Sequence, residues 1–441
     1  MSPLRPAGFI FLYSPQPPAR WSYFLADPLA RFRSRGNDVA MVEGGKTHSM
    51  TSSDPLALLQ SVFEVHSKGH RRDPSGPPFQ GGAVGYFSYE ALHYLEDVPL
   101  PDTDDVNAPW MDFSFFDAGV AFDHLEKKFH VFGRTEKTDE LKNQFQTALA
   151  DLQKSAGTLG KTGKIVSNFS NSAYVRAVQD IQGHIAAGDT FQANVSQRFE
   201  AQTTKTPWDV FVKLNQINPS PYSAFLQSAD LALVSASPEL LFSIEGNRIV
   251  TRPIAGTRPR GKSKAQDDQL EAELKENAKE NAEHAMLVDL ERNDVGRICH
   301  AGSVHVQEGF VVEKYSHVQH LVSQVEGRLQ PGKTAFDALR ALFPGGTITG
   351  CPKVRTMQIL REVEPVVRGP YTGSLGWIGW NGDAAFNILI RTIYFKTQKD
   401  RDKTKQTAYF HAGGGIVYDS VPEHEYEESL QKAEALREAL K

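Results

Sequence analysis

The sequence predicts a mixed α/β fold, and three local patterns support that prediction. Apolar residues recur at helical spacing between Val175 and Ile185, which predicts an amphipathic helix. Apolar and polar residues then alternate from Phe191 to Ser196, as they do in a strand with one buried face. Further on, Gly246-Asn247 lies between two apolar runs and predicts a tight β-hairpin.

The composition is typical of a globular protein and excludes several classes. The chain has 441 residues, 40% of them hydrophobic, which suggests two or three structural units at about 150 residues each. Asp and Glu number 53 against 48 Lys and Arg, so we expect no nucleic-acid binding. No apolar run approaches the ~18 residues that span a bilayer, so we expect no membrane insertion. Cys299 and Cys351 are too few for a disulfide framework, which predicts a reduced, cytoplasmic protein.

A boundary between two parts is expected close to residue 150. A polar helix starting near Thr135 leads into the Gly-, Lys- and Thr-rich segment 154–164, which is typical of a connection. We therefore predict an amino-terminal module over residues 1–150 and a second region over residues 165–441. The second region begins with the helix described above, which Asn171 or Ser172 would cap and Gly188 would end.

Two stretches after this helix place polar groups on strands. Gln192 begins a row of hydrogen-bonding side chains on one face of the predicted strand; such rows commonly face water, so the pattern alone leaves their role open. In the hairpin, a two-residue turn would place Glu239 opposite Ile254. Ala255 would then point to the other face of the sheet unless a bulge shifts the register, which the nearby prolines favour.

Two pairs of glutamates have the i, i+3 spacing that places both side chains on one helix face. One pair is Glu280 and Glu283, and the other is Glu425 and Glu428. If the two faces met across a cleft, their carboxylates would supply the hard oxygen ligands that Mg²⁺ prefers. Two solvated acidic faces are the alternative on spacing alone.

Two glycine-rich segments, 345–353 and 413–415, offer exposed backbone N–H groups. The first has neither the glycine spacing nor the Lys-Ser/Thr ending of a nucleotide-binding loop, so we exclude a nucleotide site. Both suit the binding of a carboxylate, with plain structural turns as the alternative. Cys351 lacks the Gly-x-Cys-x-Gly surroundings of a glutaminase nucleophile, so the chain has no evident means of releasing ammonia from glutamine.

An ordered set of motifs resembles those of the chorismate-utilising enzymes. They are FQANVSQRF at 191–199, SPELL at 237–241, PIAGTRPRG at 253–261, EHAMLVDLERNDVGR at 283–297, TITGCPKVR at 347–355 and the segment 413–428. The segment PPFQGGAVGYFSYE in the first module also resembles the family's amino-utilising members. The resemblance implies an α/β (α+β) fold in which antiparallel sheets pack as a sandwich with surrounding helices.

The same resemblance implies roles for individual residues toward chorismate. Glu239 would protonate the departing C4 hydroxyl, because hydroxide is a poor leaving group. Mg²⁺ would be held by Glu283 and Glu428, supported by Glu280 and Glu425, and would bind the ring carboxylate. The enolpyruvyl carboxylate would be bound by Tyr371, Arg391 and the backbone of Gly413, Gly414 and Gly415, and the ring pocket would be lined by His320, Thr347 and Lys353.

Family position also implies the nucleophile. Members that add water resemble one another in having a lysine where this chain has Gln192, whereas the amino-transferring branches have glutamine. Ammonia is therefore the expected nucleophile, and a separate class I glutaminase subunit is the expected source.

Two amino-transferring branches remain, and different residues favour each. Asn194, Ile348-Thr349 and Phe386-Asn387 resemble the aminodeoxychorismate synthase branch, which makes 4-amino-4-deoxychorismate for para-aminobenzoate and folate. Ala255 instead resembles the anthranilate synthase branch, because many aminodeoxychorismate synthases carry a nucleophilic lysine there. We expect the first activity, with anthranilate formation for tryptophan synthesis as the alternative and a non-catalytic chorismate-binding regulator as the minor one.

Overall fold

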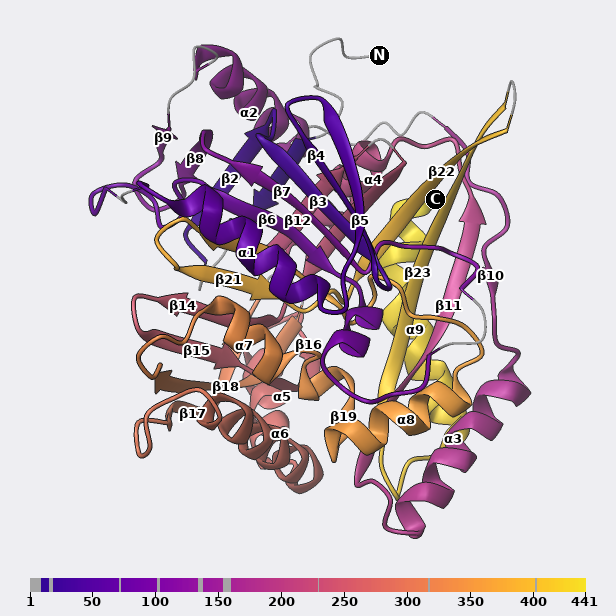
Figure 1. Ribbon diagram of the computed structural model, residues 1–441. Coiled ribbons are helices and arrows are strands. Elements are labelled where there is room, and N and C mark those ends of the chain that lie inside the picture. Colours follow the sequence, from indigo (N-terminus) through magenta and orange to yellow (C-terminus); the bar gives the residue numbers. More distant parts are fainter. Residues whose placement is uncertain are drawn as a thin grey trace.

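Two large antiparallel sheets form the centre of this computed structural model (Figure 1). The structure describes residues 9–15, 19–70, 73–100, 104–133, 138–153, 160–228, 230–315, 318–400 and 403–441. Within these ranges, one sheet contains 11 strands and the other contains 12. The antiparallel α/β sandwich expected from the motifs is therefore confirmed.

The first sheet joins strands from both ends of the chain. Its order is β10 (Val166–Ser167), β11 (Gln192–Gln202), β23 (Lys403–Ile416), β22 (Thr392–Asp400), β13 (Leu231–Ser237), β12 (Tyr222–Gln227), β1 (Phe9–Tyr13), β2 (Trp21–Ala26), β8 (Gly119–Asp123) and β9 (Lys128–Phe132), with β19 (Gly350–Cys351) paired to β11.

The second sheet is built in the same mixed way. Its order is β16 (Ile254–Pro259), β18 (Val318–Arg328), β15 (Arg248–Arg252), β14 (Leu240–Glu245), β21 (Ala384–Asn387), β20 (Ser374–Gly379), β6 (Gly82–Phe87), β7 (Met111–Phe116), β3 (Ala30–Arg35), β4 (Asp38–Glu43) and β5 (Lys46–Thr51), with β17 (His305–Lys314) paired to β18. Strands from both sides of the predicted boundary near residue 150 thus share each sheet, and the two segments of sequence do not form separate sheets.

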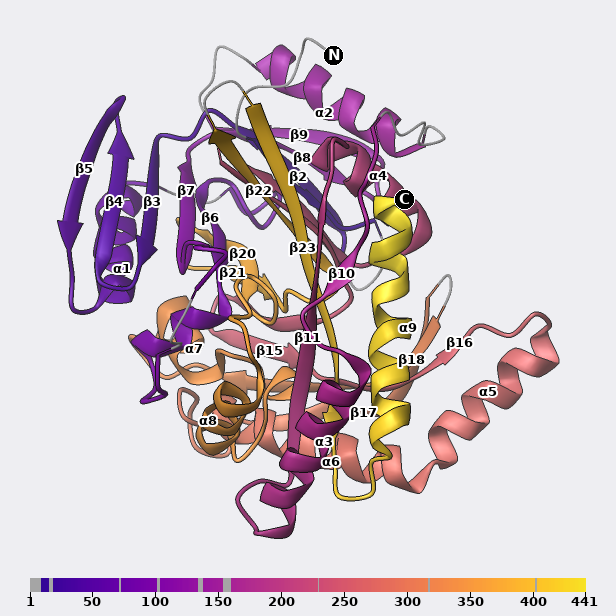
Figure 2. The ribbon, with the colours of Figure 1, turned by 90° about the vertical axis from the view of Figure 1, so that its right-hand side faces the viewer.

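Helices cover the outer faces of the sandwich, and in Figure 2 the last of them runs alongside β23. The α-helices are α1 (Pro55–Ser67), α2 (Thr138–Gln153), α3 (Asn171–Ala186), α4 (Pro207–Ile217), α5 (Lys264–Glu276), α6 (Ala278–Gly296), α7 (Ala335–Leu342), α8 (Lys353–Val363) and α9 (Pro422–Leu440), and the 3₁₀ helices are η1 (Tyr89–Tyr94) and η2 (Gly346–Ile348).

The core is layered because successive side chains of a strand point to opposite faces. In β1, Phe9 and Phe11 face outward into a cluster shared with α2, α4 and α9. Ile10 and Leu12 face inward and join residues of both sheets, Val84 of β6 among them. Packing between the sheets therefore holds together parts of the chain that are far apart in sequence.

The local predictions for the second region are largely confirmed. Helix α3 forms where the apolar spacing predicted it, but Ser170 caps it by accepting a hydrogen bond from the backbone N–H of Ala173 at 3.2 Å, in place of Asn171 or Ser172. In β11, the polar row does not face water, since Gln192 and Ser196 are buried.

The hairpin turn at Gly246-Asn247 is also confirmed, with Glu245 paired to Arg248. The apolar run before it, however, is not one strand. It breaks at Pro238, where the chain leaves β13 in the first sheet and enters β14 in the second. Proline has no N–H to give to a sheet, so the ladder ends there and the chain is free to change sheets.

Candidate active site

A cavity of about 220 Å³ lies where elements of both sheets meet, and it collects seven of the fifteen predicted site residues. Its walls come from β11, β16, β18, β23, η2, α9 and the loops beside β13, β20 and β22. Among the residues that line it are Glu239, Ala255, His320, Thr347, Tyr371, Arg391 and Gly413.

Glu239 occupies the crossing between the sheets. Its backbone N–H donates to the Ser237 hydroxyl at 3.3 Å, and its carbonyl accepts from the N–H of Ile388 at 3.0 Å. These bonds fix the backbone, while Oε1 of the side chain is buried without a hydrogen-bond partner. The carboxyl group is thus held in place with one oxygen free for a ligand.

Burial raises the pKa of Glu239 to about 7. The Thr347 hydroxyl, the backbone N–H of Ile254 and the positive charge of Arg391 each favour the carboxylate and offset part of that effect. A carboxyl with this pKa is protonated in a large fraction of molecules at neutral pH and can act as a general acid.

The wall of the cavity formed by β16 and β18 contains a β-bulge. Between Ala255 and Thr257 the pairing of β16 with β18 shifts by one residue, and Gly256 takes a positive φ of +59°. Ala255 therefore lines the same cavity as Glu239. The bulge expected from the sequence is present, and it turns position 255 toward the acid.

His320 on β18 is a neutral imidazole. Its Nδ1 lies 2.9 Å from the Thr257 hydroxyl, and its Nε2 is buried without a hydrogen-bond partner. Burial, followed by the nearby charge of Arg391, lowers its pKa to about 3. Near neutral pH the ring contributes a hydrogen-bonding group to the cavity and no charge.

Arg391 and Tyr371 provide a positive charge and a hydrogen-bond donor with which the cavity can bind an anion. Arg391 has a positive φ of +50°, and its Nη1 donates to the Asn218 side chain at 3.0 Å. Tyr371 is stacked on His411, with ring centroids 4.9 Å apart and planes 8° from parallel. Burial raises the pKa of the Tyr371 phenol to about 12, so it remains a hydrogen-bond donor. Sequence reasoning missed His411, which no motif singled out.

The three glycines continue β23 as a strand and do not form a turn. Gly413 pairs with Ser196 across the sheet, and an added Cβ at this position would lie 2.1 Å from the Val195 carbonyl oxygen. A Cβ at Gly415 would lie 2.3 Å from Nε2 of Gln192. Gln192 therefore packs against this glycine and is not among the residues that line the cavity.

The two glutamate pairs sit on α6 and α9 as their spacing predicted. Glu280 accepts from Arg258 at 2.8 Å, but its Oε2 is buried without a partner. On α9, Lys432 pairs with Glu428 at 2.7 Å, and the Ser420 hydroxyl donates to Glu425 at 2.7 Å. An added Cβ at Gly414 would lie 3.1 Å from Glu425 and 3.8 Å from Glu428, so the α9 pair borders the glycine strand.

These carboxylates fit Mg²⁺ in their chemistry, and the free oxygen of Glu280 is available to a cation. In the part of the chain that the structure describes, however, no group of three or more His, Cys, Asp or Glu side chains gathers around a common point. The α6 pair, which includes Glu283, and the α9 pair would have to approach one another before they could share an ion.

Lys353, one of the three residues expected to line the ring pocket, lies outside the cavity. It begins α8, where its ammonium group pairs with the buried carboxylate of Asp294 and donates to the Leu342 carbonyl at 3.1 Å. It is not among the residues that line the cavity. The TITG loop in front of it does reach the cavity, through Thr347 in η2.

The chain belongs to the chorismate binding enzyme family, whose pattern it matches over residues 9–438. It is 42% identical to aminodeoxychorismate synthase component 1 of Bacillus subtilis, covering 96% of this chain and 89% of that protein. It is 38% identical to anthranilate synthase component 1 of Acetivibrio thermocellus, covering 96% and 87%. The crystal structure of anthranilate synthase component I from Streptococcus pneumoniae aligns with a TM-score of 0.79 at 33% identity, covering 95% and 92%.

These comparisons confirm the family that the motifs indicated, and they confirm that the chain has the fold of chorismate-utilising enzymes. No helix among the described residues is both long and apolar enough to cross a membrane.

Proposed function

We propose that this protein combines chorismate with ammonia to form 4-amino-4-deoxychorismate, a precursor for para-aminobenzoate and folate. The observation that carries the proposal is Glu239, a carboxyl group with a pKa of about 7 inside a cavity that also contains Arg391 and Tyr371. An acid, an anion-binding group and an enclosed space are what the loss of a hydroxyl group from a carboxylated ring requires.

In the proposed reaction, the C4–O bond of chorismate breaks and Glu239 gives its proton to the departing hydroxyl, which leaves as water. A C–N bond forms with ammonia, whose nitrogen then loses one proton and restores the protonated form of Glu239. Chorismate and ammonia thus give the amine and water, with no oxidant or reductant. Arg391 and Tyr371 would hold the enolpyruvyl carboxylate, and His320 and Thr347 would contact the ring.

Mg²⁺ is part of the proposal as a bound cofactor. Glu283 and Glu428 would hold it, with Glu280 and Glu425 beside them, and the ion would neutralise the ring carboxylate. The support is the oxygen-rich donor set on α6 and α9 and the free Oε2 of Glu280.

Ammonia would come from a separate class I glutaminase subunit. Burial raises the pKa of both the Cys299 and Cys351 thiols, which leaves neither as an activated nucleophile for glutamine. The component 1 designation of the Bacillus subtilis relative agrees with a second subunit.

Formation of anthranilate is the second candidate, and Ala255 favours it. Position 255 of the cavity is an alanine, so no lysine is present there to attack C2 of the ring. The anthranilate branch also lacks a lysine at this position. The Acetivibrio thermocellus relative shows that anthranilate synthases lie at nearly the same level of identity.

The test is to supply purified protein with chorismate, Mg²⁺ and ammonium and to identify the product by mass spectrometry. We expect 4-amino-4-deoxychorismate; anthranilate with released pyruvate would establish the second candidate instead, and isochorismate would overturn the choice of ammonia over water. Binding of chorismate without consumption would point to a non-catalytic regulator. Glutamine should replace ammonium only after a glutaminase subunit is added.

A further inference from the structure

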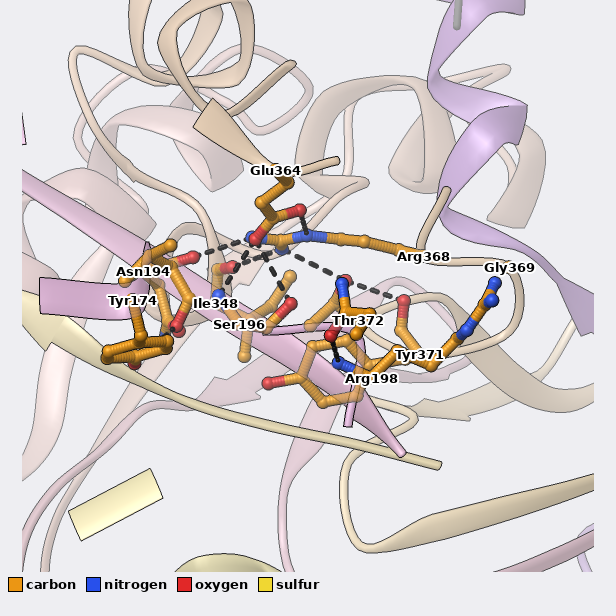
Figure 3. A network of polar contacts seen from close by, with 12 residues as sticks. Tyr174, Asn194, Ser196, Arg198, Ile348, Glu364, Arg368, Gly369, Tyr371 and Thr372 are labelled. Atoms are coloured by element: carbon orange, nitrogen blue, oxygen red, sulfur yellow. Dashed lines mark hydrogen bonds and ion pairs between the residues drawn. The ribbon is translucent and has the colours of Figure 1, made fainter. Parts of the chain in front are cut away.

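Arg368 has a complete set of hydrogen-bond partners in the interior of the protein (Figure 3). An arginine side chain has five N–H donors in a fixed plane. Nε and one N–H of Nη2 bind the two oxygens of Glu364 at 2.8 and 2.7 Å. The other Nη2 donor reaches the Asn194 carbonyl at 2.6 Å, and Nη1 reaches the Ile348 carbonyl at 3.1 Å and the Thr372 hydroxyl at 3.2 Å.

Three of these partners connect Arg368 to the lining of the chorismate cavity. Asn194 and Ile348 themselves line it, the first on β11 and the second at the end of η2. The Thr372 hydroxyl donates to the carbonyl of Tyr371, a third residue of the lining. Arg368 is not among the lining residues, so it joins three walls from behind.

Glu364 extends the same network along β11. One of its oxygens accepts from the backbone N–H of Ser196 at 2.8 Å and from the Ser196 hydroxyl at 3.0 Å. Ser196 is paired with Gly413, and Asn194 is paired with Gly415. The hydrogen bonds from Ser196 of β11 to Glu364 therefore also help to fix β23, the neighbouring strand that contains the three glycines.

We propose that Arg368, oriented by Glu364, is a positioning residue that sets the shape of the substrate cavity by holding β11, η2 and Tyr371 in register. This inference rests on the proposed function, in which the cavity binds chorismate. A planar guanidinium is needed because its donors point in fixed directions to partners on separate segments. Lysine has three donors on one nitrogen and would leave some of these buried acceptors unpaired.

The chain offers a matched control in Arg198. This residue is also buried, lies on β11 and forms a two-pronged ion pair with Asp105. Its backbone is paired with that of His411 in the sheet, but its side chain is bonded to Asp105 and Glu200 and not to a residue of the cavity lining. Arg368→Lys and Arg198→Lys each remove a buried guanidinium from an ion pair, and they should differ in what they do to the cavity.

The experiment measures chorismate consumption in ammonium and Mg²⁺, chorismate binding by calorimetry, and the unfolding midpoint of each variant. We expect Arg368→Lys to raise KM and the binding Kd for chorismate about tenfold and to lower kcat/KM about 100-fold, the scale of a small misplacement of catalytic groups. Arg198→Lys should leave KM within about twofold. Loss of active molecules alone would lower the apparent kcat and leave KM unchanged.

A second variant covers the case in which Arg368→Lys does not fold. Thr372→Val removes one acceptor of Arg368 and the bond to the Tyr371 carbonyl while keeping the shape of the side chain, and it should raise KM several-fold. The proposal is overturned if KM and Kd stay at the wild-type values in either folded variant, or if Arg198→Lys raises them equally. A wild-type protein that neither binds nor consumes chorismate would overturn the proposed function as well. If the wild type converts chorismate to any product, the role of Arg368 can be judged from the variants independently of which product forms.

Discussion

Replacement of Glu239 by glutamine removes a proton donor and preserves the size of the side chain. The amide oxygen can still accept from the Ile254 N–H, so the crossing between the sheets should keep its geometry. With a pKa of about 7, roughly half of the Glu239 side chains carry a proton at pH 7. Glutamine carries none to give, and the loss of a general acid typically lowers kcat by about 10²–10⁴-fold.

The pH dependence gives a more specific readout. At a constant concentration of unprotonated ammonia, wild-type kcat/KM for chorismate should fall as pH rises through about 7, because the carboxylate form cannot protonate the leaving group. The pKa of His320, about 3, and of Tyr371, about 12, lie outside this range. The residual activity of Glu239→Gln should therefore lack the fall near pH 7.

The same substitution should lower activity but raise the stability of the folded protein at neutral pH. Since the folded-state pKa of Glu239 is above its ordinary value, its contribution to stability is present at low pH and is lost as pH rises from about 4.5 to 7. That interval corresponds to about 3 kcal/mol. Relative to wild type, Glu239→Gln should therefore gain about 2–3 kcal/mol in urea unfolding between pH 5 and pH 8.

Glu245→Gln is the matched control, since Glu245 is an exposed carboxylate at the end of β14, the strand that begins directly after Glu239. It should leave kcat unchanged. An unchanged kcat in Glu239→Gln, or persistence of the fall near pH 7, would refute the assignment of Glu239 as the acid.

Three further predictions concern the rest of the site. Gly413→Ala should lower stability and nearly abolish chorismate binding in calorimetry, because its Cβ would lie 2.1 Å from the Val195 carbonyl oxygen; Gly183→Ala, at an exposed position of α3 with open space around an added Cβ, should retain binding, and equal binding by both variants would contradict this. Glu428→Gln should raise the Mg²⁺ concentration needed for half-maximal activity at least tenfold, and removal of Mg²⁺ by a chelator should stop turnover; full activity in chelator would remove the metal from the mechanism. Ala255→Lys should allow a chorismate adduct that can be trapped and seen by intact mass, and should change the ratio of C2 to C4 amination, because position 255 faces the same cavity as Glu239; no trapped mass and unchanged products would exclude this position as a determinant.

The sequence by itself determined the features that depend on neighbouring residues. The Gly246-Asn247 turn and helix α3 follow from backbone preferences and apolar spacing, which act over a few residues. The bulge at Ala255 could be expected for the same reason, and the ordered motifs were specific enough to identify the family. Through the family resemblance they also led to seven residues of the cavity lining, because the reaction requires an acid, an anion-binding group and a glycine at particular positions.

Only the tertiary structure decided what surrounds those residues. Glu239 has a raised pKa because segments distant in sequence remove water from it, and no local pattern reports such desolvation. The position of Lys353 also depends on a distant segment, because its ammonium group pairs with Asp294 of α6 outside the cavity. Glu364 and Arg368 have the spacing of an ordinary surface pair, and their role emerges only where β11 and η2 arrive to accept the remaining donors. Electrostatics and hydrogen bonding between distant segments depend on which of them become neighbours, and that is fixed by packing of the whole chain.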